Sequence, residues 1–330
     1  MIIDIHSHIY TRSYLDLLSR RSEIPRVEVH DDGHHLVIFP DEARLLGGTV
    51  AMTPAFWELE EKAAFMLAAG IDVSVISLGN PWLDFLPAEE APDAARSVNT
   101  ELDELAGGSE AFRALGVLPM QTPEAAVDEV AFVAERRNLH GVILGTRAGD
   151  APLDAPEVAP IWAALERTGL PVFLHPHYGL GYDEMTGRGH AMPLALGFPF
   201  ETTAAAVRLI LDGLLDRHPN LQIVLAHAGG ALPFLAGRLE KCVSVDAVAR
   251  AKLQRPFREY LGMLFYDAVT YAVEPLRALI AQVGSDRVMF GTDHPFGIAD
   301  PGLSLSVINA VCESQEEREA IRSGTATRLL

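Results

Sequence analysis

Eight short runs of aliphatic and aromatic residues alternate with helix-length amphipathic stretches along this chain, and this alternation limits the folds it can adopt. The runs are apolar at successive positions, which is the pattern of strands buried on both faces of a parallel sheet. Eight β/α repeats are more typical of a (β/α)₈ barrel than of a doubly wound sheet. We expect strands at Ile2–Ile5, Asp72–Leu78, Ala114–Leu118, Gly141–Leu144, Pro171–Leu174, Gln222–Ala226, Met263–Tyr266 and Arg287–Phe290.

The stretches between these runs carry the usual signals of helix ends. Thr122 followed by Pro123 is typical of a helix start, and Gly70 is typical of a helix end. We expect helices at Glu58–Ala69, Pro123–Arg137, Glu157–Thr168, Thr202–Arg217 and Val273–Val283. A chain of 330 residues suggests two domains by length alone, but α/β barrels use this length for one, so we predict a single domain over residues 1–330.

Two segments interrupt the alternation. Residues 10–57 form an insertion after the first strand, in which Arg26–His30 and His34–Phe39 flank Asp31-Asp32-Gly33 and predict a β-hairpin. The second segment, His177–Phe200, follows the fifth strand and is rich in Gly, Pro and Tyr. Because loops after barrel strands carry the active site, we expect both segments to shape a substrate pocket.

Composition excludes several classes of protein. The 26 basic residues against 45 acidic ones leave a net charge of −19, which disfavours nucleic-acid binding. Hydrophobic residues make up 49% of the chain, which is enough for a large core and excludes disorder as the main state. The two cysteines are too few for a disulfide framework. Without a secretory signal or a charge-free apolar run near membrane-spanning length, we expect a cytoplasmic protein with no membrane contact.

Histidines and one aspartate fall where the predicted strands end. His6 and His8 end the first strand, His175 the fifth, His227 the sixth, and Asp293 the eighth. The carboxyl ends of barrel strands share one rim, and alternation along a strand points His6 and His8 in one direction. A single such histidine is more often structural, but the joint pattern predicts a metal site. Imidazoles with one carboxylate suit a divalent ion such as zinc.

These residues lie within longer motifs that carry a family resemblance. The motifs are Ile3-Asp4-Ile5-His6-Ser7-His8, Gly116-Val117-Leu118-Pro119-Met120-Gln121, Gly197-Phe198-Pro199 running into Glu201-Thr202-Thr203, Ala226-His227-Ala228-Gly229-Gly230 through Arg238, and Gly291-Thr292-Asp293. With them the chain resembles the metal-dependent amidohydrolase superfamily, and in particular the branch of aminocarboxymuconate-semialdehyde decarboxylase.

The resemblance implies a distorted (β/α)₈ barrel that holds one divalent metal. The implied ligands are His6, His8, His175 and Asp293, with His227 beside the metal as acid/base and Asp293 as a second candidate for proton transfer. Members that bind two metals bridge them with a lysine at the end of strand four, whereas this chain has Leu144-Gly145-Thr146 there. We therefore expect one ion, zinc before manganese.

The resemblance also bears on substrate and assembly. It makes Arg238 a contact for a substrate carboxylate, with a surface or interface salt bridge as the alternative. It also implies a homodimer, in which the segment Ala231–Ala251 would face the partner. His177 and Tyr178, in the segment after the fifth strand, are further candidates to contact substrate, although loop tyrosines are usually packing residues.

Two catalytic activities and one non-catalytic role remain open on this sequence. A metal at this rim would lower the pKa of a bound water or polarise a substrate oxygen. We favour a decarboxylase acting on a small unsaturated or aromatic carboxylic acid. The same ligand set also serves a hydrolase or hydratase acting on a related acid, lactone or amide. A barrel that binds metal without catalysis is the third possibility.

Overall fold

Eight parallel strands form one sheet in the order β1-β5-β6-β7-β10-β11-β12-β13 in the computed structural model, which describes residues 1–31, 33–42 and 50–330. Their bounds are β1 (Ile3–His8), β5 (Val73–Ser77), β6 (Phe112–Gly116), β7 (Leu139–Leu144), β10 (Val172–Leu174), β11 (Ile223–Leu225), β12 (Phe265–Asp267) and β13 (Val288–Met289). Backbone bonds from Ile5 N to Phe290 O (3.0 Å) and from His8 N to His294 O (2.7 Å) join the last strand to the first. The predicted barrel is confirmed, with a strand in each predicted run.

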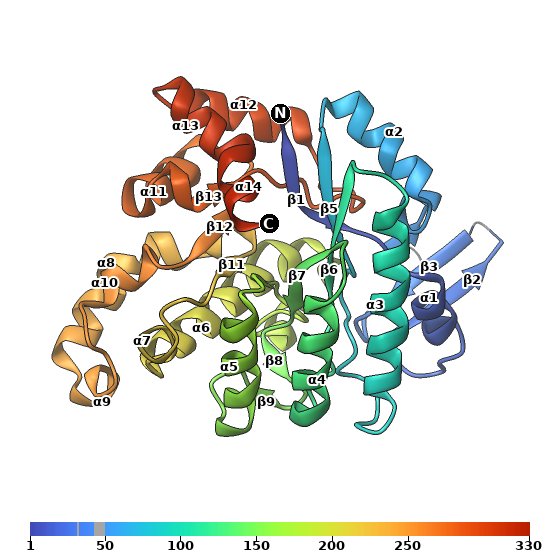
Figure 1. Cartoon of the computed structure of the whole chain (residues 1–330), viewed down its shortest axis with the longest axis horizontal. Helices are drawn as coiled ribbons and strands as arrows, with labels where there is room; N and C mark the ends of the chain where they lie inside the picture. Colours follow the sequence, from blue (N-terminus) through green and yellow to red (C-terminus); the bar gives the residue numbers. More distant parts are fainter. Residues whose placement is uncertain (32, 43–49) are drawn as a thin grey trace.

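Helices surround this barrel on its outside (Figure 1). The longer ones are α2 (Leu59–Ala69), α3 (Ala91–Gly107), α4 (Pro123–Ala134), α5 (Ala159–Thr168), α6 (Phe198–Leu211), α8 (Leu232–Val245), α11 (Val273–Val283) and α12 (Pro301–Val311). The shorter ones are α1 (Arg12–Ser19), α7 (Leu214–Arg217), α9 (Ala247–Arg250), α10 (Phe257–Leu261), α13 (Gln315–Glu319) and α14 (Thr325–Leu329).

Two details of the helix prediction differ from the structure. The predicted helix Thr202–Arg217 is two helices, α6 and α7, because Gly213 between them adopts a φ of +76°. Thr122 does precede Pro123 at the start of α4, but its hydroxyl donates to Ala88 O (3.0 Å) and makes no capping bond to the helix. Gly70, with a φ of +69°, ends α2 as predicted.

The insertion after β1 builds a small sheet beside the barrel (Figure 1). β2 (Arg26–His30) pairs antiparallel with β3 (Gly33–Val37), and β4 (Val50–Met52) extends the pair into three strands. The sequence predicted two strands here and neither β4 nor α1. Asp32, in the predicted turn, lies outside the described residues. A two-stranded ribbon of β8 (Arg147–Ala148) and β9 (Ala151–Pro152) follows β7.

One helical stretch in the described part of the chain has the length and hydropathy of a membrane span. Pro193–Leu211 joins a short π-helical turn (Pro193–Gly197) to α6 and has a mean hydropathy of 1.4. However, 44% of it is buried inside the structure, and on its outer side Arg208 pairs with Asp154 (2.9 Å). These are also the properties of a helix that covers a barrel.

Candidate metal centre and active site

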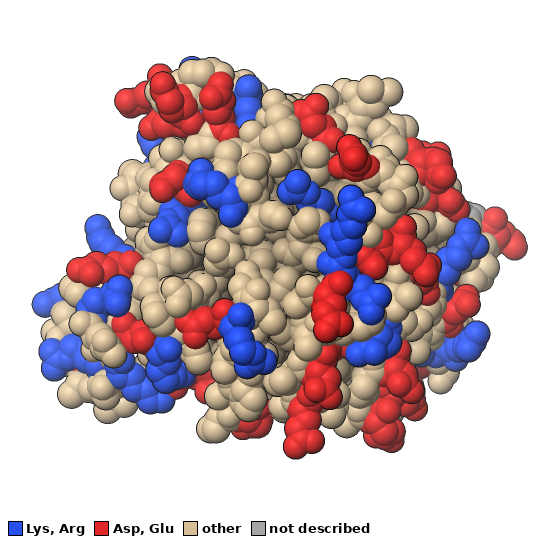
Figure 2. Space-filling model, in the orientation of Figure 1, with Lys and Arg blue, Asp and Glu red and all other residues tan. Residues whose placement is uncertain are grey.

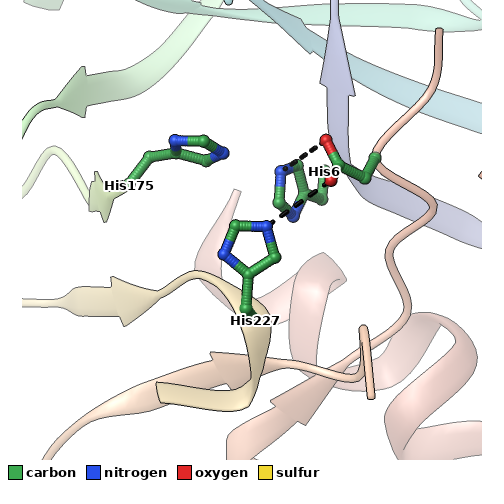
Figure 3. Close-up of side chains that lie close together, drawn as sticks. His6, His175 and His227 are labelled. Carbon is green, nitrogen blue, oxygen red and sulfur yellow. Dashed lines mark ion pairs between the residues drawn. The ribbon is translucent and has the colours of Figure 1, made fainter. Parts of the chain in front are cut away.

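Four imidazoles and one carboxylate meet at the carboxyl-terminal rim of the barrel. His6 and His8 lie on β1, and His175, His227 and Asp293 follow β10, β11 and β13. His6, His175, His227 and Asp293 each offer one ligand atom within 4.8 Å of the others. Figure 3 shows His6, His175 and His227 approaching one another from three different strand ends. The side chain of His227 is 15% exposed, and the other four residues are buried.

Asp293 divides its two oxygens between the imidazoles. Its Oδ1 lies 3.4 Å from His6 Nε2 and 3.4 Å from His8 Nε2, and these two nitrogens are 3.1 Å apart. Its Oδ2 lies 3.5 Å from His227 Nε2. Two ligand atoms of one ion, bonded at about 2.1 Å with angles between 90° and 109°, stand about 3.0–3.4 Å apart. The separations among His6, His8 and Asp293 Oδ1 therefore fit one shared divalent ion.

The hydrogen bonds made by Nδ1 of His6, His8 and His175 leave the Nε2 lone pairs of these three rings directed at the place where the shared ion would lie. His6 Nδ1 donates to Asp267 Oδ2 (2.7 Å), and His175 Nδ1 donates to Pro176 O (2.8 Å). His8 Nδ1 lies 3.2 Å from the hydroxyl of Ser77, which itself donates to a carbonyl. Each Nε2 is then an acceptor without a proton, and that of His175 is buried with no hydrogen-bond partner. Facing lone pairs beside a carboxylate repel one another unless a cation lies between them, so the residues fit a metal ion.

The charges of His8, His175 and Asp293 agree with a cation-binding role, whereas the pKa of His6 is raised, because the opposite effect of burial is outweighed by the carboxylates of Asp293 and Asp267. Burial lowers the pKa of His8 to about 4 and the pKa of His175 well below its usual value, which keeps both rings neutral and able to bind a metal. Burial alone would raise the pKa of Asp293, but His6, His227 and His8 outweigh it and hold that pKa well below its usual range. The carboxylate is therefore ionised at neutral pH.

A closed parallel barrel with imidazoles and a carboxylate on its carboxyl-terminal rim defines a class of barrel metalloenzymes. This chain belongs to the amidohydrolase family, whose model matches residues 3–330.

Related proteins place the chain among decarboxylases. It is 31% identical over 285 residues to "Gamma-resorcylate decarboxylase" of Rhizobium sp. (strain MTP-10005), covering 82% of this chain and 86% of that one. It is 38% identical to the solved apo form of Metarhizium anisopliae IDCase, with a TM-score of 0.92 over 100% of this chain and 96% of that one. A crystal structure of 5-carboxyvanillate decarboxylase from Sphingomonas paucimobilis shares 25% identity at a TM-score of 0.83, covering 99% of this chain and 98% of that one. The predicted amidohydrolase-superfamily enzyme is confirmed.

The residues predicted to contact substrate lie in two different places: His177 and Tyr178 lie beside the rim, and Arg238 lies on α8. His177 is buried beside the rim, where its Nε2 lies 2.7 Å from Asp84 Oδ1 and its ring stacks on that of Tyr178 at 4.7 Å. Gly145 makes this place available, because a Cβ there would stand 2.4 Å from His177 Nδ1. Arg238, by contrast, is exposed on α8 and makes no ion pair or hydrogen bond with any residue in the described ranges.

Three further residues support the rim, and sequence reasoning assigned none of them a role. Asp267 ends β12 and accepts the hydrogen bond from His6. The predicted seventh strand ended at Tyr266, so Asp267 was not recognised as a polar residue at the carboxyl end of a strand. Lys62 is fully buried on α2, where its Nζ bonds Ser7 Oγ (2.9 Å) and His294 Nδ1 (2.8 Å). No sequence signal distinguished this lysine from a solvated residue of an amphipathic helix.

Glu201 is the third, and it ties α6 to the segment after β10. One carboxylate oxygen accepts from Thr146 Oγ1 and His177 N (3.1 Å), and the other from Tyr178 N (3.2 Å) and Gly179 N (2.5 Å). Four donors saturate this carboxylate. Glu201 therefore sets the path of the segment that carries His177 and Tyr178.

We expect Glu201→Gln to raise KM about tenfold while kcat changes less than threefold. The amide NH₂ would face backbone N–H donors, which costs roughly 1–3 kcal/mol and loosens the segment without touching the metal ligands. Steady-state kinetics with a substrate acid measures both parameters. Asp154→Asn, which removes only the surface pair with Arg208 on α6, is the matched control and should leave KM unchanged. An unaltered KM in Glu201→Gln would mean that the segment does not contact substrate.

Proposed function

We propose that this protein is a metal-dependent decarboxylase of a small unsaturated or aromatic carboxylic acid. The proposal rests mainly on one observation: imidazole nitrogens with free lone pairs and the Asp293 carboxylate lie close together on the rim, largely buried. The names of its relatives favour decarboxylation over hydrolysis, because they act on acids such as gamma-resorcylate and 5-carboxyvanillate.

In this proposal His6, His8, His175 and Asp293 hold one divalent ion and His227 is the acid/base. His227 also lies within the ligand-atom cluster, so it competes with His8 for the fourth place. The two oxygens of Asp293 support His8: His6 Nε2 and His8 Nε2 each lie 3.4 Å from Oδ1, whereas His227 Nε2 lies 3.5 Å from Oδ2. With imidazoles dominating the ligands, we propose zinc, with manganese as the alternative.

The bound metal supplies a Lewis acid for a substrate oxygen. His227, partly exposed at the mouth of the site, is placed to deliver a proton to the carbon that carries the substrate carboxylate. As that C–H bond forms, the C–C bond breaks, CO₂ leaves, and the bonding electron pair returns to the conjugated system. Asp293 Oδ2 lies 3.5 Å from His227 Nε2 and orients the ring for this transfer. The burial of the other rim residues limits the access of bulk water to these groups during the proton transfer.

Metal analysis combined with a CO₂-release screen tests the proposal. The panel holds hydroxylated benzoic acids, carboxyvanillate-like acids and muconate-like acids, each offered to metal-loaded protein. We expect metal-dependent CO₂ release from at least one acid. Hydrolysis of a lactone or amide panel without any CO₂ release would instead make the enzyme a hydrolase.

We also propose that the protein is a homodimer formed through α8 and α9. Phe234, Val245 and Val248 are 89%, 70% and 86% exposed there, which is unusual for apolar side chains. Basic side chains gather over the neighbouring helices at the lower left of Figure 2 despite the acidic net charge. Arg238, exposed on α8, would bring one of these charges to the interface and toward a substrate carboxylate.

Replacing Arg238 with Ala is expected to lower kcat/KM for a carboxylate substrate about 10–100-fold. A charge-assisted contact contributes roughly 1.5–3 kcal/mol, which corresponds to this range. Kinetics and light scattering are measured together, with Arg137→Ala, an exposed arginine that follows α4 outside the proposed interface, as the control for surface charge. Unchanged kinetics would mean that Arg238 does not contact the substrate, and a mass near the 35.8 kDa of a single chain for the wild type would contradict the dimer.

A further inference from the structure

We infer that Asp267 is a positioning residue that places two parts of the active site with one carboxylate. It orients the metal ligand His6 and it holds the backbone turn from which His227 projects. The inference rests on the proposed function for the roles of His6 and His227. The contacts themselves, however, are independent of the reaction.

The Asp267 carboxylate is fully buried and saturated by four N–H donors. Its Oδ2 accepts from His6 Nδ1 (2.7 Å) and His227 N (2.9 Å). Its Oδ1 accepts from Ala228 N (2.8 Å) and Val269 N (3.0 Å). Since a carboxylate only accepts hydrogen bonds, it fixes the proton of His6 on Nδ1 and leaves Nε2 free to bind the ion. Such a partner raises the basicity of the ligand as well as setting its ring plane.

The second half of the role concerns the backbone after β11. His227 and Ala228 have φ values of +53° and +56°, in the left-handed region that side chains with a Cβ rarely occupy. Such conformations persist only where surrounding contacts impose them. Two of those contacts are the hydrogen bonds from the amides of these residues to Asp267. Without them the turn would relax, and the His227 side chain would leave its place beside Asp293.

Asparagine cannot replace this carboxylate in either orientation of its amide. With the NH₂ at the Oδ2 position, it would face His6 Nδ1–H and the His227 amide. With the NH₂ at the Oδ1 position, it would face the amides of Ala228 and Val269. Either way two buried donors lose their acceptor, although the side chain keeps its size. Asp267→Asn is therefore a nearly isosteric test.

The first measurement is metal affinity, by competition of Zn²⁺ or Mn²⁺ with a chelator and without substrate. We expect Asp267→Asn to raise the metal dissociation constant about 10–100-fold, the usual effect of removing the hydrogen-bond partner of a ligand imidazole. Glu201→Gln is the matched control, since it also removes a carboxylate that accepts three backbone amides but touches none of the rim imidazoles. Its metal dissociation constant should stay within twofold of the wild type.

The second measurement is hydrogen exchange by mass spectrometry. In Asp267→Asn the amides in peptides covering residues 226–230 should exchange at least tenfold faster, whereas in Glu201→Gln the acceleration should move to residues 177–179. At saturating metal, kcat for an acid identified by the CO₂ screen should stay at least tenfold below the wild type, with KM changed less than threefold. A merely structural residue would lower the melting temperature without this pattern.

Unchanged metal affinity, or unchanged exchange at residues 226–230, would overturn the inference. If Asp267→Asn fails to fold, ¹⁵N NMR of the histidine rings in the wild-type holoenzyme is the test instead, with the His6 ring signals assigned by through-bond connection to the His6 backbone. A proton on His6 Nδ1 is the expected result, and a proton on Nε2 would refute it. Absence of CO₂ release from every acid would overturn the proposed function alone, because metal affinity, exchange and NMR require no substrate.

Discussion

His227→Asn is expected to keep its full metal content while kcat falls about 10²–10⁴-fold, the usual loss on removal of a general acid/base. The nitrogen His227 Nε2 faces Asp293 Oδ2, the oxygen turned away from His6 and His8, so its loss should leave the proposed ligand set intact. An asparagine amide fills part of the space but cannot exchange a proton near neutral pH, as an imidazole can. Elemental analysis and steady-state kinetics on the same preparation measure both quantities.

His6→Asn is the matched comparison, because it removes an imidazole whose Nε2 is proposed to bind the ion. This variant should lose metal and activity together. Loss of metal from His227→Asn would make His227 a ligand, and the proton donor would then be Asp293 or His177. His294 is a weaker candidate, since its Nδ1 bonds Lys62 and its ring stacks on Phe65 at 3.8 Å. Full turnover with full metal would contradict the mechanism.

Removal of the metal with a chelator is expected to lower kcat/KM at least about 10³-fold. Lewis-acid stabilisation by a bound ion is worth several kcal/mol, and each 1.36 kcal/mol corresponds to about a factor of ten. Activity should return on adding about one equivalent of zinc or manganese per chain, because the fourth barrel strand ends at Leu144-Gly145-Thr146 without a bridging lysine. Titrating metal into stripped protein while following activity gives the stoichiometry.

A reproducible optimum near two equivalents would contradict the single-ion site. Turnover that survives complete removal of the metal would contradict the metal mechanism itself. Stripped protein should also be checked for its secondary structure, since loss of activity through unfolding would otherwise be mistaken for loss of a Lewis acid. Recovery of activity on adding metal distinguishes these two causes.

The barrel and the positions of the rim residues could be predicted from the amino-acid sequence alone. Apolar runs such as Gly141–Leu144 are local features, and a strand forms wherever such a run can be buried on both faces. In a barrel of eight parallel strands, the carboxyl ends of all the strands lie on one rim. His6, His175, His227 and Asp293 were therefore expected together although up to 287 positions separate them, and the structure places them within 4.8 Å.

The groups that surround the ring nitrogens of these histidines could not be predicted, because they depend on how the whole chain folds. The partner of His6 Nδ1 is Asp267, 261 residues away, and no local pattern specifies that pairing. The buried Lys62 has the same origin, because its neighbour Ser7 lies on β1 and its neighbour His294 lies on the segment after β13, where the barrel closes. Periodicity reports which side of an element faces the core. The bonding of each polar atom depends on contacts that exist only after the chain has folded.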